Sequence, residues 1–135
     1  MNDNPLFQQW IEKADEDFYF ASHYIEDEEH FFAPLCFHFH QAAEKYLKSF
    51  IVAHHLSFRK IHNLKELVQI CVGKDDSFSN ILDECIYLNQ FYIETRYPVH
   101  WPTGFTKKDA YEAKENALAI GTFIKDKLSM SKDKQ

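Results

Sequence analysis

Apolar residues recur at steps of three and four along most of the chain, and this spacing predicts helices rather than strands. The first such stretch follows Asn4 and Pro5, a helix cap and a first helical residue, and it closes at the acidic segment 26–30. The apolar stripe consists of Phe7, Trp10, Ile11, Ala14, Phe18, Ala21 and Ile25. The opposite face is charged, so we expect one side to pack on a core and the other to face solvent.

The longest helical pattern runs from about Pro34 to His55 and has two unlike sides. The apolar side, which belongs in the core, comprises Leu35, Phe39, Ala42, Ala43, Tyr46, Leu47 and Phe50. The polar side comprises His38, His40, Gln41, Glu44, Lys45 and Lys48, and it includes Phe37 and Ile51. A polar face with apolar side chains in it more often meets another surface than open water.

Two further helices are predicted in the middle of the chain. Asn63 caps a short one that ends at Gly73. The next spans about 78–97, because Pro98 disfavours the helical conformation in the residue before it. The apolar stripe of this helix, continued to its last turn, places Arg96 on the inward side, where a cation also suits the helix dipole.

The last predicted helix opens with Thr106 and Asp109 in capping-box spacing and repeats its apolar residues to Leu128. The connections are short, so neighbouring helices should lie antiparallel in an all-α, up-and-down bundle of four to five helices. We expect residues 1–130 to form a single domain and residues 131–135 to form a polar tail that frays.

Composition narrows the class of protein. The chain has 135 residues, 3 Gly and 4 Pro, and three glycines could hardly supply a phosphate-binding loop or a nucleophile elbow. No run approaches the roughly 20 apolar residues that span a bilayer, and the first residues lack a secretion signal, so we expect a cytoplasmic protein without a membrane segment. Cys36, Cys71 and Cys85 fall in apolar patterns and are interpreted as small core residues.

Charge is distributed unevenly along the chain. The net charge of −6 argues against a protein that coats DNA, because neutralising phosphates needs clustered Lys and Arg. Residues 1–29 hold nine acids and one lysine, so the remaining residues carry a small positive excess of fourteen bases over twelve acids. An anionic ligand would therefore meet the later helices.

Two kinds of chemistry can be considered at the polar positions. His38 and His40 do not share a helix face, and His40 with Glu44 lacks a third ligand, so we interpret the latter pair as a surface contact and expect no metal and no cofactor. An inward guanidinium at Arg96 must find an acceptor, and Glu44 is the structural candidate. Alternatively, Arg96 binds a phosphate while His100 moves a proton to or from an oxygen.

Several segments together resemble the HEPN family, small helical domains of bacteria and archaea, over nearly the full length. They are Trp10, Ala14 and Asp17, then CFHFHQAAEKYLKSF at 36–50, KIHNLKEL at 60–67 and LNQFYIETRYP at 88–98. The resemblance implies a helical bundle, usually a homodimer, often encoded beside a minimal nucleotidyltransferase with which it forms a toxin–antitoxin pair. Some members cleave RNA without a metal, and others bind nucleotides or serve as non-catalytic partners.

The resemblance leaves three functions open. Family ribonucleases have an arginine followed, after four to six residues, by a histidine, whereas Arg96 and His100 have three residues between them. This shorter spacing favours a dimeric module that binds nucleotide or RNA and acts with a nucleotidyltransferase partner over a metal-independent endoribonuclease. The phosphate-binding residues would be Gln41, Lys45, Lys48 and Arg96. The third possibility is a non-catalytic interaction scaffold whose Gln41/Lys45/Lys48 face is closed by a partner.

Overall fold

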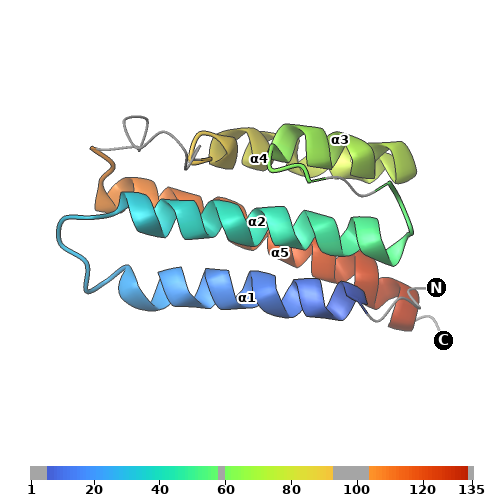
Figure 1. Cartoon of the computed structure of the whole chain (residues 1–135), viewed down its shortest axis with the longest axis horizontal. Coiled ribbons are helices and arrows are strands. Elements are labelled where there is room, and N and C mark those ends of the chain that lie inside the picture. Colours follow the sequence, from blue (N-terminus) through green and yellow to red (C-terminus); the bar gives the residue numbers. More distant parts are fainter. Residues whose placement is uncertain (1–5, 58–59, 93–103, 134–135) are drawn as a thin grey trace.

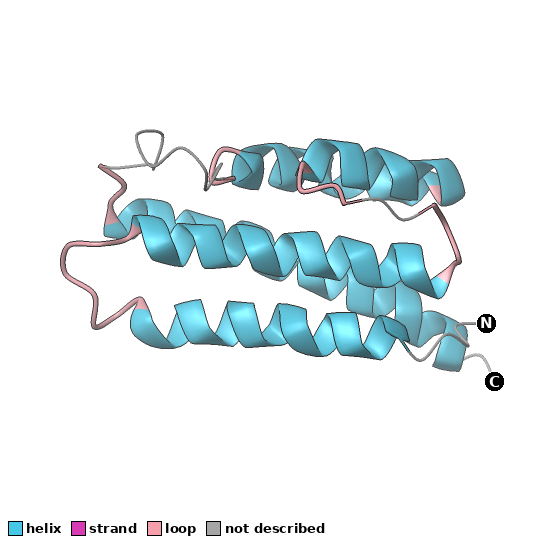
Figure 2. Ribbon diagram, in the orientation of Figure 1, coloured by secondary structure: helices cyan, strands magenta, loops and turns pink. Residues whose placement is uncertain are grey.

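The computed structural model describes residues 6–57, 60–92 and 104–133, with side chains as far as position 129. The described elements are α1 (Leu6–Tyr24), α2 (Ala33–Ala53), α3 (Leu64–Lys74), the 3-10 helix η1 (Asp76–Ile81), α4 (Leu82–Asn89) and α5 (Lys107–Asp133). Within these ranges every regular element is a helix (Figure 2). The predicted all-α bundle is therefore confirmed.

Helix α2 occupies the centre of the bundle. It packs against α1 on one side and against α3 and α4 on the other, and α5 lies behind it (Figure 1). Helices α1 and α2 run antiparallel and are joined by a turn at one end of the bundle (Figure 1). Because α2 has neighbours on most sides, even Ile51 on its predicted polar side is fully buried.

The predicted helix caps at the starts of α3 and α5 are confirmed. The Asn63 side chain accepts hydrogen bonds from the backbone N–H groups of Lys65 and Glu66, at 2.9 and 3.2 Å. Thr106 and Asp109 form the reciprocal pair of a capping box, with N···O distances of 2.8 and 3.2 Å. Helix α5 continues to Asp133, past the position where the polar tail was expected to fray, since no glycine or proline interrupts it there.

The fourth predicted helix is shorter than the sequence pattern indicated. Its first residues form η1, and α4 ends at Asn89, so the predicted helix over 78–97 is wrong at both ends. The backbone N–H of Tyr92 donates to the carbonyl of Asn89 at 3.2 Å, a three-residue step that closes the helix. The apolar stripe therefore cannot place Arg96, which lies outside the described residues.

The three cysteines are core residues, as predicted. Cys36, Cys71 and Cys85 are buried free thiols. Burial raises the pKa of Cys36 and of Cys85 to about 12, so these thiols stay protonated and behave as small apolar side chains. No helix in the described ranges combines the length and the apolar composition that a bilayer-spanning segment needs.

Candidate functional site

A group of polar and aromatic side chains lies along the side of α2 that faces α3 and α4. We call it the Glu44 cluster, and it consists of His40, Glu44, Lys48, His62 and Tyr92. The three residues from α2 are four positions apart and therefore share one helix face. All three are buried, with 4% of Glu44 exposed, so the predicted surface contact between His40 and Glu44 is wrong. The cause is coverage by His62, just before α3, and by Tyr92, just after α4.

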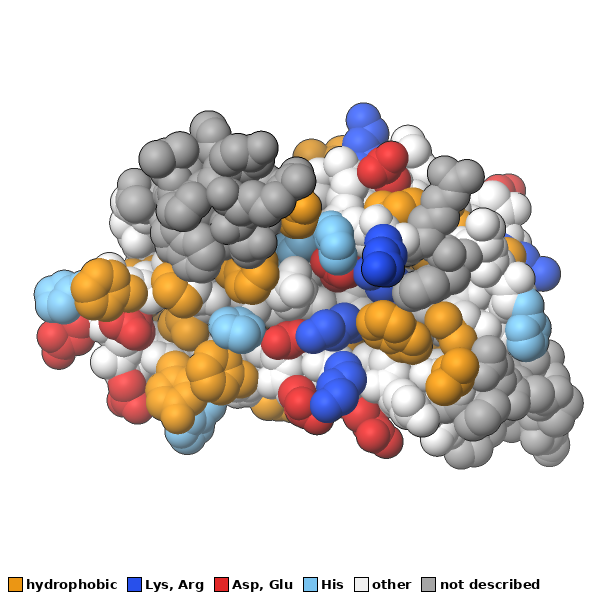
Figure 3. Space-filling view, in the orientation of Figure 1, with side chains coloured by type: hydrophobic (Ala, Val, Ile, Leu, Met, Phe, Trp, Pro, Cys, Tyr) orange, Lys and Arg blue, Asp and Glu red, His pale blue; other side chains and the backbone are white. Residues whose placement is uncertain are grey.

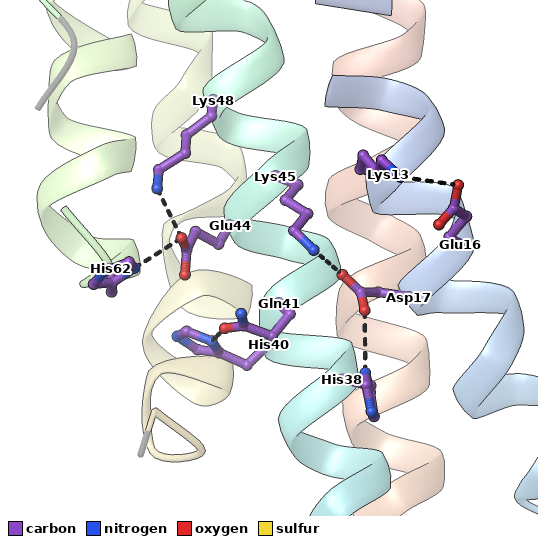
Figure 4. Close-up of polar contacts among 10 residues, drawn as sticks. All are labelled: Lys13, Glu16, Asp17, His38, His40, Gln41, Glu44, Lys45, Lys48 and His62. Carbon is purple, nitrogen blue, oxygen red and sulfur yellow. Dashed lines mark hydrogen bonds and ion pairs between the residues drawn. The ribbon is translucent and has the colours of Figure 1, made fainter. Parts of the chain in front are cut away.

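The Glu44 carboxylate receives two hydrogen bonds at one oxygen. Its Oε2 atom accepts from Lys48 Nζ at 2.7 Å and pairs with His62 Nδ1 at 2.9 Å (Figure 4). The other oxygen, Oε1, is buried and has no hydrogen-bond partner among the described residues. A buried carboxylate is costly unless its charge is compensated, and Lys48 provides that compensation here. The open Oε1 atom can accept a further donor.

Aromatic rings form a row over the same cluster. The rings of Tyr92 and His62 are nearly parallel, at 13° with centroids 5.9 Å apart, and Tyr92 also lies 5.8 Å from His40. Burial lowers the pKa of His40, against opposing contributions from Gln41 and Glu44, so His40 is neutral near pH 7. The row opens to solvent at its outer end, where the His62 side chain is 49% exposed.

A second group, the Asp17 cluster, joins α1 to α2 and consists of Asp17, His38 and Lys45. The two oxygens of Asp17 pair with His38 Nδ1 at 3.1 Å and with Lys45 Nζ at 2.5 Å (Figure 4). Burial is the largest influence on the pKa of Asp17 and acts to raise it. The hydrogen bonds from His38 and Lys45 outweigh burial, and the pKa lies below its usual value.

The predicted phosphate-binding residues do not converge on one point. Lys45 turns toward α1 and bonds Asp17, whereas Lys48 turns toward the segment before α3 and bonds Glu44 (Figure 4). Gln41 contacts neither cluster's carboxylate in Figure 4, and its Oε1 atom lies 3.1 Å from His40 Nδ1. The remaining predicted site residues, Arg96 and His100, lie outside the described residues, so the contact of Arg96 with Glu44 stays a prediction.

Sequence reasoning missed the roles of His62, Tyr92 and Asp17. None of the three lies on α2, where its contact partner lies, so no fixed spacing in the sequence connects the residue with that partner. The one available signal was the position of His62 directly before the Asn63 cap, which places it at the start of a helix.

The surface over these clusters carries charges of both signs. Figure 3 shows lysine and acidic side chains interleaved over α1 and α2, with apolar side chains on either side of them on the same face. Interleaved charges do not make a continuous basic groove of the kind that holds long nucleic acids. In the part of the chain that the structure describes, no group of three or more His, Cys, Asp or Glu side chains could hold a metal ion.

Comparison with known proteins identifies the bundle. A family model described as HEPN domain matches residues 7–127. The crystal structure of TT1696 from Thermus thermophilus aligns with a TM-score of 0.77 at 27% identity, covering 94% of this chain and 99% of that one. ST0689, an archaeal HEPN homologue, aligns with a TM-score of 0.70 at 23% identity over 90% of this chain and 96% of its own, which shows the fold alone. No curated protein matches the chain.

Proposed function

The chain belongs to the HEPN domain family, and from this premise we propose that it is a dimeric module that binds a nucleotide or RNA and acts with a nucleotidyltransferase partner in a toxin–antitoxin-like pair. The observation that carries the proposal is the Glu44 cluster, in which a buried carboxylate keeps one oxygen without a partner among the described residues, beside half-exposed rings. Buried polar atoms of this kind are rare unless a further group satisfies them.

Arg96 is the proposed phosphate ligand, and its place in the chain supports this role. It follows Tyr92 by four residues, a length of backbone that reaches at most about 14 Å. A guanidinium has five N–H donors, so Arg96 can donate to Oε1 of Glu44 and still bind a phosphate. Gln41, Lys45 and Lys48 are the proposed secondary ligands. Lys45 is the more accessible of the two lysines and would exchange Asp17 for phosphate.

A binding experiment tests this proposal. Adenine and guanine nucleotides and a short single-stranded RNA are titrated into the wild-type protein, Arg96→Ala and Lys65→Ala, which removes an exposed positive charge on α3. We expect Arg96→Ala to weaken binding at least tenfold, because a charge-assisted hydrogen bond to phosphate is lost, and Lys65→Ala to bind like the wild type. Equal affinity in Arg96→Ala and the wild type would remove the assigned role of Arg96.

The alternative is a metal-independent endoribonuclease that uses Arg96 and His100, and the presence of both residue types after Tyr92 favours it. A homodimer would bring two such pairs to one groove, and the RNA would be cut to a cyclic phosphate. The purified protein is incubated with a mixed RNA pool in EDTA beside Arg96→Ala and His100→Ala. Cleavage that resists the chelator and disappears in both variants supports the enzyme, and cleavage unchanged by both substitutions excludes it.

The partner proposals have their own measurements. Sedimentation at several protein concentrations tests the homodimer, and co-purification with a nucleotidyltransferase encoded beside this chain tests the hetero-complex. If no nucleotide or RNA binds, hydrogen exchange with and without that partner examines the scaffold alternative. Protection of the Gln41/Lys45/Lys48 face by the protein partner alone would favour the scaffold.

A further inference from the structure

The ring of His62 is held at Nδ1, which leaves Nε2 able to contact a ligand. Its Nδ1 atom pairs with the buried Glu44 carboxylate at 2.9 Å, although the side chain itself is 49% exposed. A carboxylate at Nδ1 selects the tautomer and fixes the ring orientation, which leaves Nε2 for a second partner. The ring plane is held further by the nearly parallel ring of Tyr92.

The charges around His62 determine which partner suits Nε2. Lys48 and Glu44 bond at 2.7 Å and cancel one another's charge. Of the other described groups against this ring, His40 is neutral because it is buried, and Tyr92 contributes its ring face. When His62 is protonated, the cluster therefore carries one surplus positive charge, placed on the half-exposed imidazolium. An anion is the ligand that such a charge favours.

We propose that His62 is a phosphate-binding residue of the nucleotide or RNA site: its imidazolium, held by Glu44 through Nδ1, donates the Nε2–H to a phosphate oxygen. This inference deepens the proposed function and rests on it. Because only the protonated ring can donate at Nε2 while also donating at Nδ1, the affinity for phosphate is greatest at low pH and falls as pH rises.

The test uses a ligand whose own charge stays constant. A short 2′-O-methylated single-stranded RNA has only phosphodiesters, which do not titrate near neutral pH, and it cannot be cleaved through its 2′-oxygen. Its affinity is measured from about pH 5.5 to about pH 8.5, the range in which histidines titrate, for the wild type, His62→Gln and His30→Gln. His30 is an exposed histidine beside Glu29 and serves as the matched control.

We expect wild-type affinity to fall about tenfold over this range, the loss of one charge-assisted hydrogen bond. His62→Gln should bind the RNA at every pH with the affinity that the wild type has at high pH. His30→Gln should show the same pH dependence as the wild type. The variant should fold, since Lys48 still compensates Glu44. A wild-type affinity independent of pH, or the same pH dependence in His62→Gln, overturns the role of His62 and leaves the proposed function standing.

A second measurement separates the inference from the proposed function. The ring-proton resonances of His62 are followed by NMR at constant pH while inorganic phosphate is added. If the wild type binds neither this RNA at any pH nor an adenine or guanine nucleotide, the proposed function fails, and the phosphate titration decides the inference alone. A shift of the His62 resonances toward their positions at low pH supports the anion site, and resonances that phosphate leaves unchanged overturn it.

Discussion

The side chain of Asn89, at the end of α4, lies against the Asn63 cap at the start of α3, with Nδ2 of Asn89 3.3 Å from Oδ1 of Asn63. The Oδ1 atom of the same Asn89 accepts from the backbone N–H of Leu64 at 2.9 Å. One amide therefore joins the end of one helix to the start of another. It also fixes the position of His62, which immediately precedes the cap and belongs to the Glu44 cluster.

Asn89→Ala should destabilise the protein by about 1 to 2 kcal/mol, because the N–H of Leu64 loses its acceptor at a helix start. Urea unfolding followed by circular dichroism measures the loss. Asn80→Ala, an exposed change in η1, should stay within about 0.5 kcal/mol of the wild type. Asn89→Asp keeps the acceptor and should recover most of the stability. If Asn89→Asp is as unstable as Asn89→Ala, the acceptor for the Leu64 N–H is not the cause of the destabilisation.

Lys48→Met should destabilise the fold by about 3 kcal/mol, because it leaves the Glu44 carboxylate buried without its main compensating charge. Both side chains of this pair are almost fully buried, with 6% and 5% exposed. The double variant Lys48→Met with Glu44→Gln should regain much of the stability, because no charge then remains uncompensated. Lys45→Met, whose side chain is more exposed, should cost far less. Additive losses in the double variant would contradict a coupled pair.

Gly121→Ala should destabilise the protein by about 1 to 2 kcal/mol, although alanine favours helices. A Cβ atom at position 121 would lie 2.8 Å from Cε2 of Tyr46, and that buried ring is tethered through its hydroxyl to Asp15. The free-energy cost of this overpacking is larger than the stability that alanine gains from its higher helix propensity. Gly73→Ala is the matched substitution, since nothing lies within 4 Å of its added Cβ, and it should leave stability unchanged or raise it. Thermal unfolding of both variants measures the contrast.

The sequence predicted those parts of the fold that depend on residues close to one another along the chain. Helix caps such as Asn63 and Thr106 act within three positions, so their patterns are visible in the chain. The end of α4 was not predictable in the same way. Its stripe of apolar residues continues past Asn89, but the Asn89 side chain bonds the start of α3, 25 residues away in sequence, and the backbone closes into a three-residue step.

The candidate site was predictable only on the helix that carries most of it. Spacing along α2 put Glu44 and Lys48 on one face, and Glu44 was the candidate acceptor for the Arg96 guanidinium. His62 and Asp17 come from other elements, and their contacts depend on how those elements pack. The same packing divides the predicted phosphate ligands, because Asp17 draws Lys45 to one side of α2 and Glu44 draws Lys48 to the other.

Asp17→Asn should make the protein less stable at neutral pH and less sensitive to acid. Burial raises the pKa of Asp17, but His38 and Lys45 lower it further, so the folded-state pKa lies below the ordinary value of 3.8. A lowered carboxyl pKa contributes stability that is fully present above 3.8 and is lost as pH falls through the folded-state pKa. We expect the variant to lose about 1 to 2 kcal/mol at pH 7, where the charge-assisted hydrogen bonds are removed.

Urea unfolding at pH 7 and near pH 3 measures both effects, with Glu12→Gln, an exposed change on the same helix, as the control. The stability difference between the wild type and Asp17→Asn should shrink at the lower pH, because the Asp17 carboxyl of the unfolded wild type then binds a proton. The control should retain the acid sensitivity of the wild type. A constant difference between the wild type and Asp17→Asn at both pH values would mean that the ionised Asp17 carboxylate does not stabilise the contact between α1 and α2.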